Sequence, residues 1–560
     1  MERRKLTRLT LALFLLFLIA GIGLGVGIII GAGKEYKGTV TITVHEREGY
    51  QDIEVRTGLT SYILSTEQGE LRSAFLHFAP YGLRRDELIV DATTDPETLA
   101  RTFAPGGIFP FTLELAGLDL EGPWDYHLLE HEEREVRLEF SNAAGGLEIR
   151  KIYIIRDDPS YAVEMELILR NPSEEEISLA GFRLLLGTDQ FQPYRGRFIT
   201  GEVRYLFDGE RTEVIPPDYR RFEGLGTVAK SVVLFLKCHT GGLEPLDPRE
   251  RDEYDRRLLG VQLRLRAEAE AEAEAEGLAI PPGEERRFQF TLYAGRPKWT
   301  LLRLSGLEKV VDISPFSWAL IGIVRFLDWL YAATGNYGWT IILFTIVVRI
   351  ILFPLMRKQY YSMAKMQRLG PKIRQLQQRY KQDREILQRK IMELYRKEGV
   401  NPLSGCLPLL IQFPILYALW RAILYSAERI HLSPGFLWMA DLSVADPYYI
   451  IVALNVLAMI LQSWLFTPTA GTGQKQNWLL TLGMPIFMGY LLRNFPAGMW
   501  LYWLWTTILQ IGQQWLINLE VRKLGPVALP AETESEVKSK AKAGPEGEAQ
   551  TRAGEGRSER

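Results

Sequence analysis

The stretch Gly335-Asn336-Tyr337-Gly338-Trp339-Thr340 is followed by an apolar run, 341–356, with Arg349 inside it, and this region decides the fold. An arginine near the middle of a membrane span costs about 2.5 to 3.5 kcal/mol on insertion scales, so it persists where it meets water, a partner or a substrate. Snorkelling to the basic exit at Arg357-Lys358 would have to bridge roughly 10 Å of helix. Thr345 lies one helical turn before Arg349. We therefore expect Arg349 and Thr345 to line a functional polar stripe.

The composition indicates two halves of different kinds. The 560 residues suffice for more than one domain, and the mean hydropathy of -0.05 averages a polar with an apolar segment. A net charge of -2 excludes a general affinity for nucleic acids or anionic surfaces, so only local clusters can contribute. Cys238 and Cys406 fall in segments that we place on opposite sides of, or within, the membrane. We therefore expect no disulfide between them.

The N-terminal segment has the pattern of a membrane anchor. A basic start, 1–8, precedes an uncharged stretch from Leu9 to Gly33. About 20 apolar residues span a bilayer, whereas a cleavable signal has a shorter apolar core. We predict an uncleaved transmembrane anchor over 1–33 with a cytoplasmic N-terminus, because positive charge precedes the span. Cleavage near Gly31-Ala32-Gly33 is the alternative.

Residues 34–311 have the pattern of an exported, mainly β domain. Short segments alternate polar and apolar residues and are bounded by Gly, Asp, Asn or Pro, which predicts strands and a large two-sheet sandwich. The predicted strands are 39–44, 152–155, 161–167, 231–236 and 288–293. The alternating Ala-Glu tract 267–276 places like charges close together, so we interpret it as a loosely ordered insert.

One motif in this domain resembles a metal site. His127-Leu128-Leu129-Glu130-His131 matches the H-x-x-E-H pattern of some zinc peptidases, in which a helix presents both imidazoles and a third ligand completes the site. Here the motif lies between Gly122-Pro123 and the strand-like segment 136–140. We therefore interpret it as a solvated acidic turn, and we expect no metal and no cofactor.

Residues 312–334 carry the signals of an interfacial helix. Ser314-Pro315 is typical of a helix start, and Arg325 and Asp328 share one side of the segment that follows. If this helix crossed the membrane, the basic loop after Met356 would face outward, against the positive-inside rule. We therefore predict an amphipathic helix on the outer surface, followed by the first core span at 335–356.

Residues 357–400 predict a basic cytoplasmic hairpin, since 13 Lys or Arg stand against four acids between 357 and 398. Apolar residues recur at helical spacing from Met363 to Tyr380, which predicts one helix. Asp383 can cap a second helix that ends at Gly399. The hairpin has two candidate partners, which can coexist: anionic lipid headgroups, and a ribosome or nascent chain. The candidate contact residues are Met363, Met366, Arg368, Lys372 and Arg374.

Four further spans are predicted within 401–519, at about 403–426, 447–466, 477–492 and 496–519, and 520–560 is predicted to be a disordered cytoplasmic tail. Aromatic residues cluster at the predicted span ends, as an aromatic belt would. Several polar residues lie within the spans, and each taken alone is more typical of a hydrogen bond between helices than of a substrate contact. They are Gln412, Asn455, Gln462, Thr506 and Gln510.

Three motifs in this order resemble the YidC/Oxa/Alb membrane protein insertase family, in particular its bacterial branch with a large periplasmic domain. The first is Gly335-Asn336-Tyr337-Gly338, before the span with Thr345 and Arg349. The second is the segment Asn401-Pro402-Leu403-Ser404-Gly405-Cys406-Leu407-Pro408 followed by Ile411-Gln412-Phe413-Pro414, and the third is Phe495-Pro496-Ala497-Gly498 followed by Leu501-Tyr502-Trp503. The Ala-Glu tract and Arg493 depart from the common family sequence.

The resemblance implies an α-helical membrane bundle of six spans, of which five form the insertase core, plus an exported all-β supersandwich similar to galactose mutarotases. It implies a hydrophilic groove open to the cytoplasm, formed here by Arg349, Thr345, Tyr502 and Gln412. An apolar path beside the groove would contain Pro408, Phe413, Leu416 and Tyr490. The implied partners are nascent membrane proteins, the Sec translocon with its accessory subunits and the ribosome, and a monomer would suffice.

Two other classes of function remain as alternatives. A membrane-tethered carbohydrate-active enzyme would need converging acids or a histidine in the β domain. A solute transporter would show inverted repeats, broken spans or intramembrane acids, and the sequence shows no such repeat. Neither alternative explains both Arg349 and the basic hairpin. We therefore expect a protein of the inner membrane that is not an enzyme and has no catalytic residue.

Overall fold

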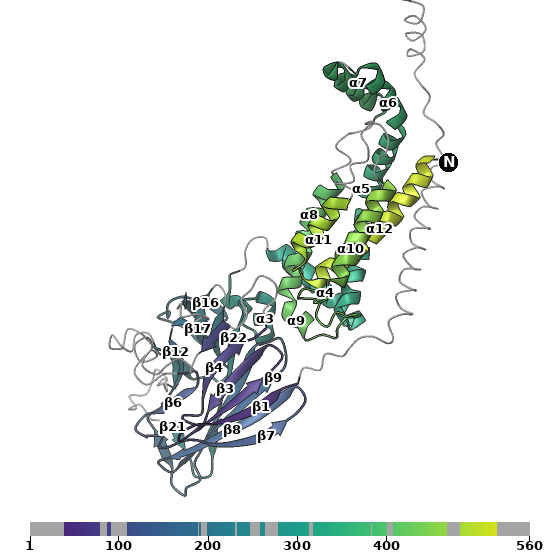
Figure 1. The fold of residues 1–560 in the computed structure, drawn as a ribbon. Coiled ribbons are helices and arrows are strands. Elements are labelled where there is room, and N and C mark those ends of the chain that lie inside the picture. The colour runs from purple at the N-terminus through teal and green to yellow at the C-terminus, as the bar shows by residue number, and fades with distance from the viewer. Residues whose placement is uncertain are drawn as a thin grey trace, which may run out of the picture.

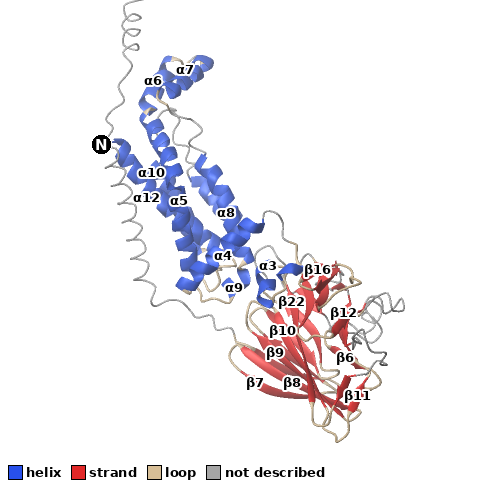
Figure 2. Cartoon of the chain, turned by 180° about the vertical axis from the view of Figure 1, so that it is seen from behind, coloured by secondary structure: helices blue, strands red, loops and turns tan. Residues whose placement is uncertain are grey.

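The computed structural model separates β structure from helical structure along one elongated molecule (Figures 1 and 2). The β domain forms one end, a bundle of helices follows, and α6 and α7 lie at the far end. The expected combination of an N-terminal β-rich domain and a C-terminal helical region is therefore confirmed. The structure describes residues 39–78, 87–90, 109–188, 190–191, 199–229, 232–246, 258–263, 278–312, 317–381, 383–399, 407–466 and 482–522.

Antiparallel sheets make up the β domain. A nine-stranded sheet has the order β16-β15-β17-β18-β22-β10-β9-β8-β7, and a five-stranded sheet runs in chain order from β1 to β5. A four-stranded sheet has the order β19-β20-β12-β6, and two pairs, β11-β21 and β13-β14, complete the described strands. The strands are β1 Thr41–Glu46, β2 Gln51–Arg56, β3 Thr60–Ser65, β4 Glu70–Leu76, β5 Glu87–Val90, β6 Thr112–Leu115, β7 Asp125–His131, β8 Glu135–Ala144, β9 Leu147–Arg156, β10 Ala162–Arg170, β11 Ile177–Leu179, β12 Phe182–Thr188, β13 Gln190–Phe191, β14 Ile199–Thr200, β15 Glu202–Phe207, β16 Glu210–Thr212, β17 Phe222–Val228, β18 Val233–Cys238, β19 Leu243–Pro245, β20 Leu258–Leu263, β21 Leu278–Ile280 and β22 Glu285–Gly295.

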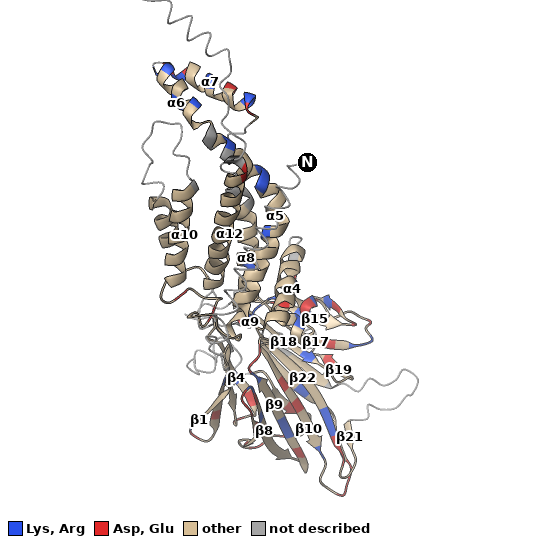
Figure 3. Ribbon diagram, turned by 90° about the vertical axis from the view of Figure 1, so that its right-hand side faces the viewer, with Lys and Arg blue, Asp and Glu red and all other residues tan. Residues whose placement is uncertain are grey.

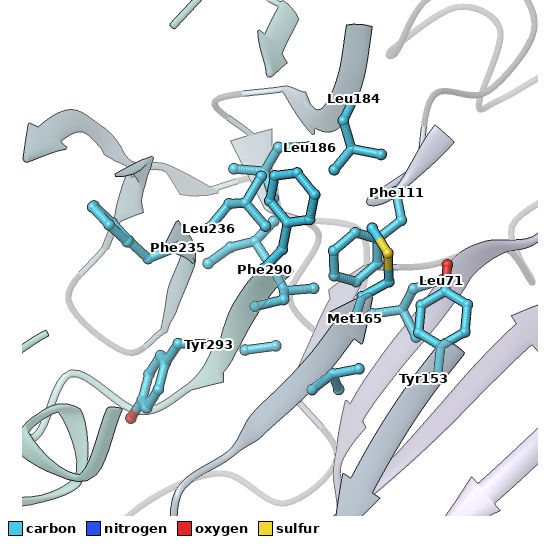
Figure 4. Packing of buried hydrophobic residues seen from close by; sticks show 14 of the residues in the cluster. Leu71, Phe111, Tyr153, Met165, Leu184, Leu186, Phe235, Leu236, Phe290 and Tyr293 are labelled. Atoms are coloured by element: carbon cyan, nitrogen blue, oxygen red, sulfur yellow. The ribbon is translucent and has the colours of Figure 1, made fainter. Parts of the chain in front are cut away.

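One buried apolar cluster joins the three larger sheets. Strand β9 alternates strictly between buried and half-buried residues, and Tyr153 points into this cluster. Figure 4 shows Tyr153 of β9 near Phe111 and Leu71, with Met165 of β10 between them and Phe290 of β22. The period of two that predicted these strands is thus the pattern that fills the core.

The prediction of an acidic turn at 127–131 is wrong. These residues form the second half of β7, which pairs with β8 at the edge of the nine-stranded sheet. His127 and His131 are consequently held on a strand, not on successive turns of a helix. Among the described residues no group of three or more potential metal ligands occurs. The sequence misled because both faces of this edge strand are mostly exposed, so it lacks the apolar alternation of a half-buried strand.

The helical region begins with the short helix α3 at the end of the β domain. Helix α4 and the bundle helices follow, and α6 and α7 form the hairpin. The α-helices are α3 Trp299–Leu302, α4 Ser317–Thr334, α5 Tyr337–Arg368, α6 Gly370–Arg379, α7 Arg384–Lys397, α8 Leu407–Tyr425, α9 Ala427–His431, α10 Ile450–Phe466, α11 Met484–Leu492 and α12 Ala497–Arg522, with 3-10 turns η3 Arg303–Ser305 and η4 Glu308–Val310. By length and composition, one described helix could cross a bilayer alone, over Tyr337–Ser362, and the apolar segment Ile450–Leu465 is shorter.

The glycines before α5 have structural reasons. Gly335 has a φ of 64°, in the left-handed region that favours glycine. A Cβ at Gly338 would lie 2.1 Å from the ring of Phe436, so only glycine permits this approach. The Asn336 amide donates to the Gly435 carbonyl oxygen at 2.9 Å. The motif therefore fastens the start of α5 to the loop that follows α9.

The predicted single helix from Met363 to Tyr380 is wrong. Helix α5 continues without a break from the apolar span to Arg368, and α6 begins at Gly370 with Pro371 in its first turn. Proline is tolerated there because the first amides of a helix have no intrahelical acceptor. The predicted cap of α7 is confirmed, since the Asp383 carboxylate accepts the Ile386 amide at 3.0 Å. Gly399 ends this arm with a φ of 63°.

Several predictions concern residues outside the described part of the chain. They are the anchor at 1–33, the Ser314-Pro315 helix start, the Ala-Glu tract, Cys406 and the tail beyond 522. Cys238, by contrast, is a buried free thiol in β18, and burial raises its pKa above the usual range.

Candidate functional site

Arg349 is buried between α5 and α12. The residue is only 4% exposed. Its guanidinium donates to the Thr506 carbonyl oxygen at 3.0 Å and to Gln510 Oε1 at 3.3 Å. No carboxylate forms an ion pair with it among the residues that the structure describes. The guanidinium has five N–H donors, so two acceptors leave capacity for a further partner. A charge held by neutral acceptors in an apolar bundle is the feature that distinguishes this site.

Helices α5 and α12 run in the same direction along this contact. Arg349 meets Thr506 and Gln510, and farther along both helices Arg357 forms an ion pair with Glu520 at 2.7 Å. Two charged residues of α5 thus fix the register of α12 at two levels.

The place of Thr345 in a polar stripe stays a prediction. It is fully buried, and its hydroxyl donates back to the Ile341 carbonyl oxygen of the same helix at 2.7 Å. Back-bonding of this kind satisfies a hydroxyl within its own helix. Thr345 therefore shares a face with Arg349 but has already committed its donor.

Gln412 and Tyr502 lie together, as the implied groove requires. The Gln412 amide of α8 donates to the Tyr502 hydroxyl of α12 at 2.7 Å, and Tyr502 is buried. This bond connects a third helix to the α5–α12 pair. Tyr502 also lies one helical turn before Thr506, whose carbonyl accepts from Arg349.

Sequence reasoning missed a set of buried glutamines. Gln359 of α5 and Gln513 of α12 bury both amide heteroatoms, and Gln514 buries its amide oxygen, without a hydrogen-bond partner in the described part of the chain. Spacing could have revealed this set, because Thr506, Gln510, Gln513 and Gln514 follow each other at intervals typical of one helical face. We call the following residues the polar seam: Arg349, Gln359, Thr506, Gln510, Gln513 and Gln514.

The other polar residues of the spans differ among themselves. Asn455 of α10 donates to the Trp500 carbonyl oxygen at 2.8 Å, which confirms its interpretation as a hydrogen bond between helices. Gln510 also makes the predicted kind of bond, since its side-chain oxygen accepts from Arg349 of α5, whereas Thr506 accepts from Arg349 through its backbone carbonyl.

The candidate apolar path is partly exposed. Phe413 is 53% exposed on α8 and Tyr490 is 66% exposed on α11, whereas Leu416 packs against the bundle core. The guanidinium of Arg493 stacks on the Tyr490 ring at 4.2 Å, so Tyr490 already has one polar neighbour. The Pro408 side chain lies outside the described residues. No hydrogen bond or ring contact joins the described members of this path to the polar seam.

The hairpin gathers positive charge at the end of the molecule opposite the β domain. Figure 3 shows Lys and Arg on α6, α7 and the adjoining end of α5, with few charges along the bundle. Met366, Leu369 and Ile373 pack with residues of α7, so they form the hairpin's own small core. Lys372 forms an ion pair with Glu398 at 3.2 Å, and Arg374 is exposed. The side chains of Met363 and Arg368 lie outside the description.

The fold therefore combines a β domain with a helical region in which an arginine is buried between two helices, one of them long and apolar enough to cross a membrane. Residues 329–523 match the model of the family described as 60Kd inner membrane protein. All three motifs that predicted the resemblance to the insertase family lie within this match, so the resemblance is confirmed for the C-terminal helical region.

Two relatives show the extent of the similarity. The chain is 40% identical over 242 residues to the membrane protein insertase YidC of Syntrophus aciditrophicus (strain SB), which covers 43% of this chain and 44% of the relative. It is 41% identical over 243 residues to the membrane protein insertase YidC of Wolinella succinogenes (strain ATCC 29543), and this match covers 43% of this chain and 45% of the relative. The chain therefore matches less than half the length of these relatives.

A solved structure extends the likeness in fold to most of the chain. It is described as an active YidC insertase crystal structure with the first transmembrane domain resolved. It is 22% identical to this chain, with a TM-score of 0.52, and covers 84% of this chain and 94% of its own. The β domain and the helical region thus occur together in a known protein.

Proposed function

We propose that this protein is a membrane protein insertase and chaperone that helps integral membrane proteins to insert, fold and assemble, alone or beside the Sec translocon. The names of the relatives support this activity, and they favour neither of the two alternative classes. The activity involves no covalent chemistry, which agrees with the expectation that the protein is not an enzyme.

The polar seam is the observation that carries the proposal. A buried amide without a partner costs about 1 to 3 kcal/mol, and the seam combines several such atoms with one charge. A cluster of this kind is tolerated where water or a polar guest supplies the missing hydrogen bonds. Water in the seam would also explain why the guanidinium of Arg349 needs no carboxylate.

The mechanism follows from these groups. A short polar or acidic segment of a nascent membrane protein enters the seam, where Arg349 and the glutamines lower the cost of moving it partway across. Its apolar segment moves along the exposed surface at Phe413 and Tyr490. Partition into lipid, at about 0.8 kcal/mol per buried CH2 group, then draws the segment out of the protein. Because the seam accepts many sequences, Arg349 favours acidic guests without selecting one.

The finer arrangement belongs to the same proposal. We place α4 on the outer surface, both chain termini in the cytoplasm and the β domain, a supersandwich, in the periplasm, with six spans in total. The hairpin then faces the cytoplasm, where its exposed cations can meet anionic lipids, a ribosome or a nascent chain. Accessory contacts of the β domain with the Sec translocon complete the proposed set of partners.

Cysteine cross-linking tests whether a substrate occupies the groove. In a variant with Cys238 and Cys406 replaced by serine, Gln412→Cys should form a disulfide with a cysteine in the polar tail of a stalled single-span substrate. Leu457→Cys is the matched control, because Leu457 is an exposed residue of α10, a helix that contributes no residue to the polar seam. Equal cross-linking at both positions, or cross-linking at 457 alone, would contradict the proposal.

A further inference from the structure

A cleft of about 330 Å³ lies where the β domain meets the helical region. The β domain contributes Arg134, Asp157 and Asp158, from the ends of neighbouring strands. The helices contribute Asp328 of α4 and Arg429 of α9. Ligand sites commonly have volumes from roughly 300 Å³ upward, so the cleft can hold a small polar group.

Two of the five charged residues are already paired with each other. Arg429 donates to the Asp328 carboxylate, and the Tyr337 hydroxyl reaches the same carboxylate at 3.4 Å. A third, Asp158, accepts the Ser160 amide at 2.8 Å and the Ser160 hydroxyl through one oxygen. These contacts shape the wall of the cleft, and Asp157, Asp158 and Arg134 keep charges that no ion pair within the described residues neutralises.

Asp157 is the residue that points to a ligand. It is 3% exposed, and its Oδ1 accepts the Gly58 amide at 2.8 Å. Its other oxygen, Oδ2, is buried and has no hydrogen-bond partner in the described part of the chain. A buried carboxylate oxygen without a donor is costly, so the site favours a ligand that brings N–H donors and positive charge.

Arg134 adds a cation to the wall of the same cleft. The Asp157 amide donates to the Arg134 carbonyl oxygen at 2.8 Å, so the two side chains originate from paired backbone positions. Arg134 is exposed, and its guanidinium forms no ion pair with the other described residues. A ligand that spans both residues would therefore carry an ammonium and an anion a short distance apart.

The surroundings of the cleft indicate a lipid. Helix α4, which lines it through Asp328 and Tyr331, exposes the indole rings of Trp318 and Trp329. Exposed tryptophans on an amphipathic helix are typical of the membrane interface, at the depth of lipid headgroups. The cleft thus opens where headgroups are the most concentrated zwitterionic molecules.

We propose that this cleft binds the headgroup of a phospholipid with a primary ammonium, such as phosphatidylethanolamine. The ammonium donates to Asp157 Oδ2, and the phosphate pairs with Arg134. A primary ammonium has three N–H donors, whereas the trimethylammonium of choline has none, so the site distinguishes these two headgroups. The proposal rests on the proposed placement of α4 on the outer surface, but it does not depend on the insertase activity, because it concerns a site outside the polar seam.

Lipid retention by the full-length protein tests the proposal. Native mass spectrometry would compare lipids of equal acyl composition with ethanolamine, choline or glycerol headgroups, and inorganic phosphate would serve as a competitor. The wild type should bind the ethanolamine lipid about tenfold more tightly than the choline lipid, as one charge-assisted hydrogen bond allows. Asp157→Asn should abolish this preference, and Arg134→Gln should weaken binding of all three lipids.

The variants distinguish binding from folding. Asparagine preserves the shape of Asp157 and can still accept from Gly58, and Arg134 is exposed, so at least one variant should remain folded. Asp208→Asn is the control, because Asp208 accepts backbone amides of Arg220 and Arg221 in a turn that does not line the cleft. Equal retention of ethanolamine and choline lipids by the wild type, or a preference unchanged in Asp157→Asn, would overturn the proposal. Displacement of the lipid by inorganic phosphate would overturn it too.

Discussion

At the scale of single residues, the partners of Arg349 explain why a charge can remain in the bundle. A carboxylate partner would neutralise the guanidinium and compete with a guest, whereas a carbonyl and an amide stabilise it and leave its charge available. The neighbouring glutamines extend the same chemistry along α12. Substitution of Gln513 tests whether these glutamines interact with the substrate or only stabilise the fold.

Replacement of Gln513 by leucine should separate these roles. If water or substrate solvates the Gln513 amide, Gln513→Leu should change stability by less than about 1 kcal/mol, because an apolar group of similar shape replaces an unpaired one. Insertion of a substrate with a polar tail should fall several-fold. Thermal unfolding in detergent and insertion into vesicles measure the two effects.

Asn455 provides the matched control for Gln513. It is equally buried, but its amide donates to Trp500 across α10 and α12. Asn455→Leu should therefore cost about 0.5 to 1.5 kcal/mol and leave the activity per folded molecule unchanged. Wild-type insertion by Gln513→Leu would show that the seam is a structural feature.

At the scale of elements, Lys151 shows how one side chain of β9 holds two distant loops. Its ammonium donates to the carbonyl oxygens of Gln68 and Phe111, both at 2.8 Å, and of Gly69 at 3.1 Å. These three acceptors match its three donors. Burial lowers the pKa of Lys151 and raises the pKa of Glu70, and the attraction between the two groups opposes both shifts.

Loss of this ammonium should destabilise the β domain strongly. Lys151→Met leaves three carbonyl oxygens without their donor, and each buried group left unpaired costs about 1 to 3 kcal/mol, so the total loss should be several kcal/mol. Chemical denaturation followed by tryptophan fluorescence measures the loss. Lys237→Met is the comparison, because Lys237 is half-buried and donates mainly to the Ser305 carbonyl oxygen, so its loss should cost only about 1 kcal/mol. Equal effects would refute the assigned role of Lys151.

The elements also show what the sequence could predict. Strands such as β9 and β10 bury one face in the core, so the alternation of apolar and polar residues was enough to predict them. Strand β7 was missed because an edge strand exposed on both faces carries no such period. Lys151 lies on a predicted strand, but its acceptors are about 40 and 83 residues away, and no local pattern relates them. The α5 site was predictable because an arginine in an apolar run is conspicuous, whereas the partners on α12 depend on how the helices pack.

At the scale of the whole molecule, a buried ion pair joins the β domain to the helices. The Lys298 ammonium, just before α3, donates to both oxygens of Glu428 of α9 at 2.7 Å and to the Leu424 carbonyl oxygen at 2.6 Å. Nearby, the ring of Phe78 stacks on His431 at 4.1 Å. These contacts couple the β domain to α8 and α9, and so determine how rigidly it sits on the bundle.

Removal of one partner should loosen this connection. Lys298→Met leaves the fully buried Glu428 without its cation, so spin-label distances between the β domain and α4 should broaden. The double variant Lys298→Met with Glu428→Leu should restore the narrow distribution, because the second change removes the carboxylate that the first leaves without its cation. Replacement of the surface pair Arg287 and Glu166 should have no effect, since both residues lie within the β domain. An unchanged distribution in Lys298→Met would show that other contacts hold the domains.

The account depends most on Arg349, and one reconstituted assay tests it directly. Vesicles containing wild type, Arg349→Lys or Arg349→Ala would insert a single-span substrate with a short acidic outer tail, and Arg325→Ala, a change at an exposed arginine of α4, would serve as control. We predict that lysine retains most of the activity and that alanine loses about tenfold or more, most of all for the acidic tail, as loss of one charged contact implies. Equal insertion by all four proteins would contradict the central claim that a charged, hydrated seam carries the polar segment across.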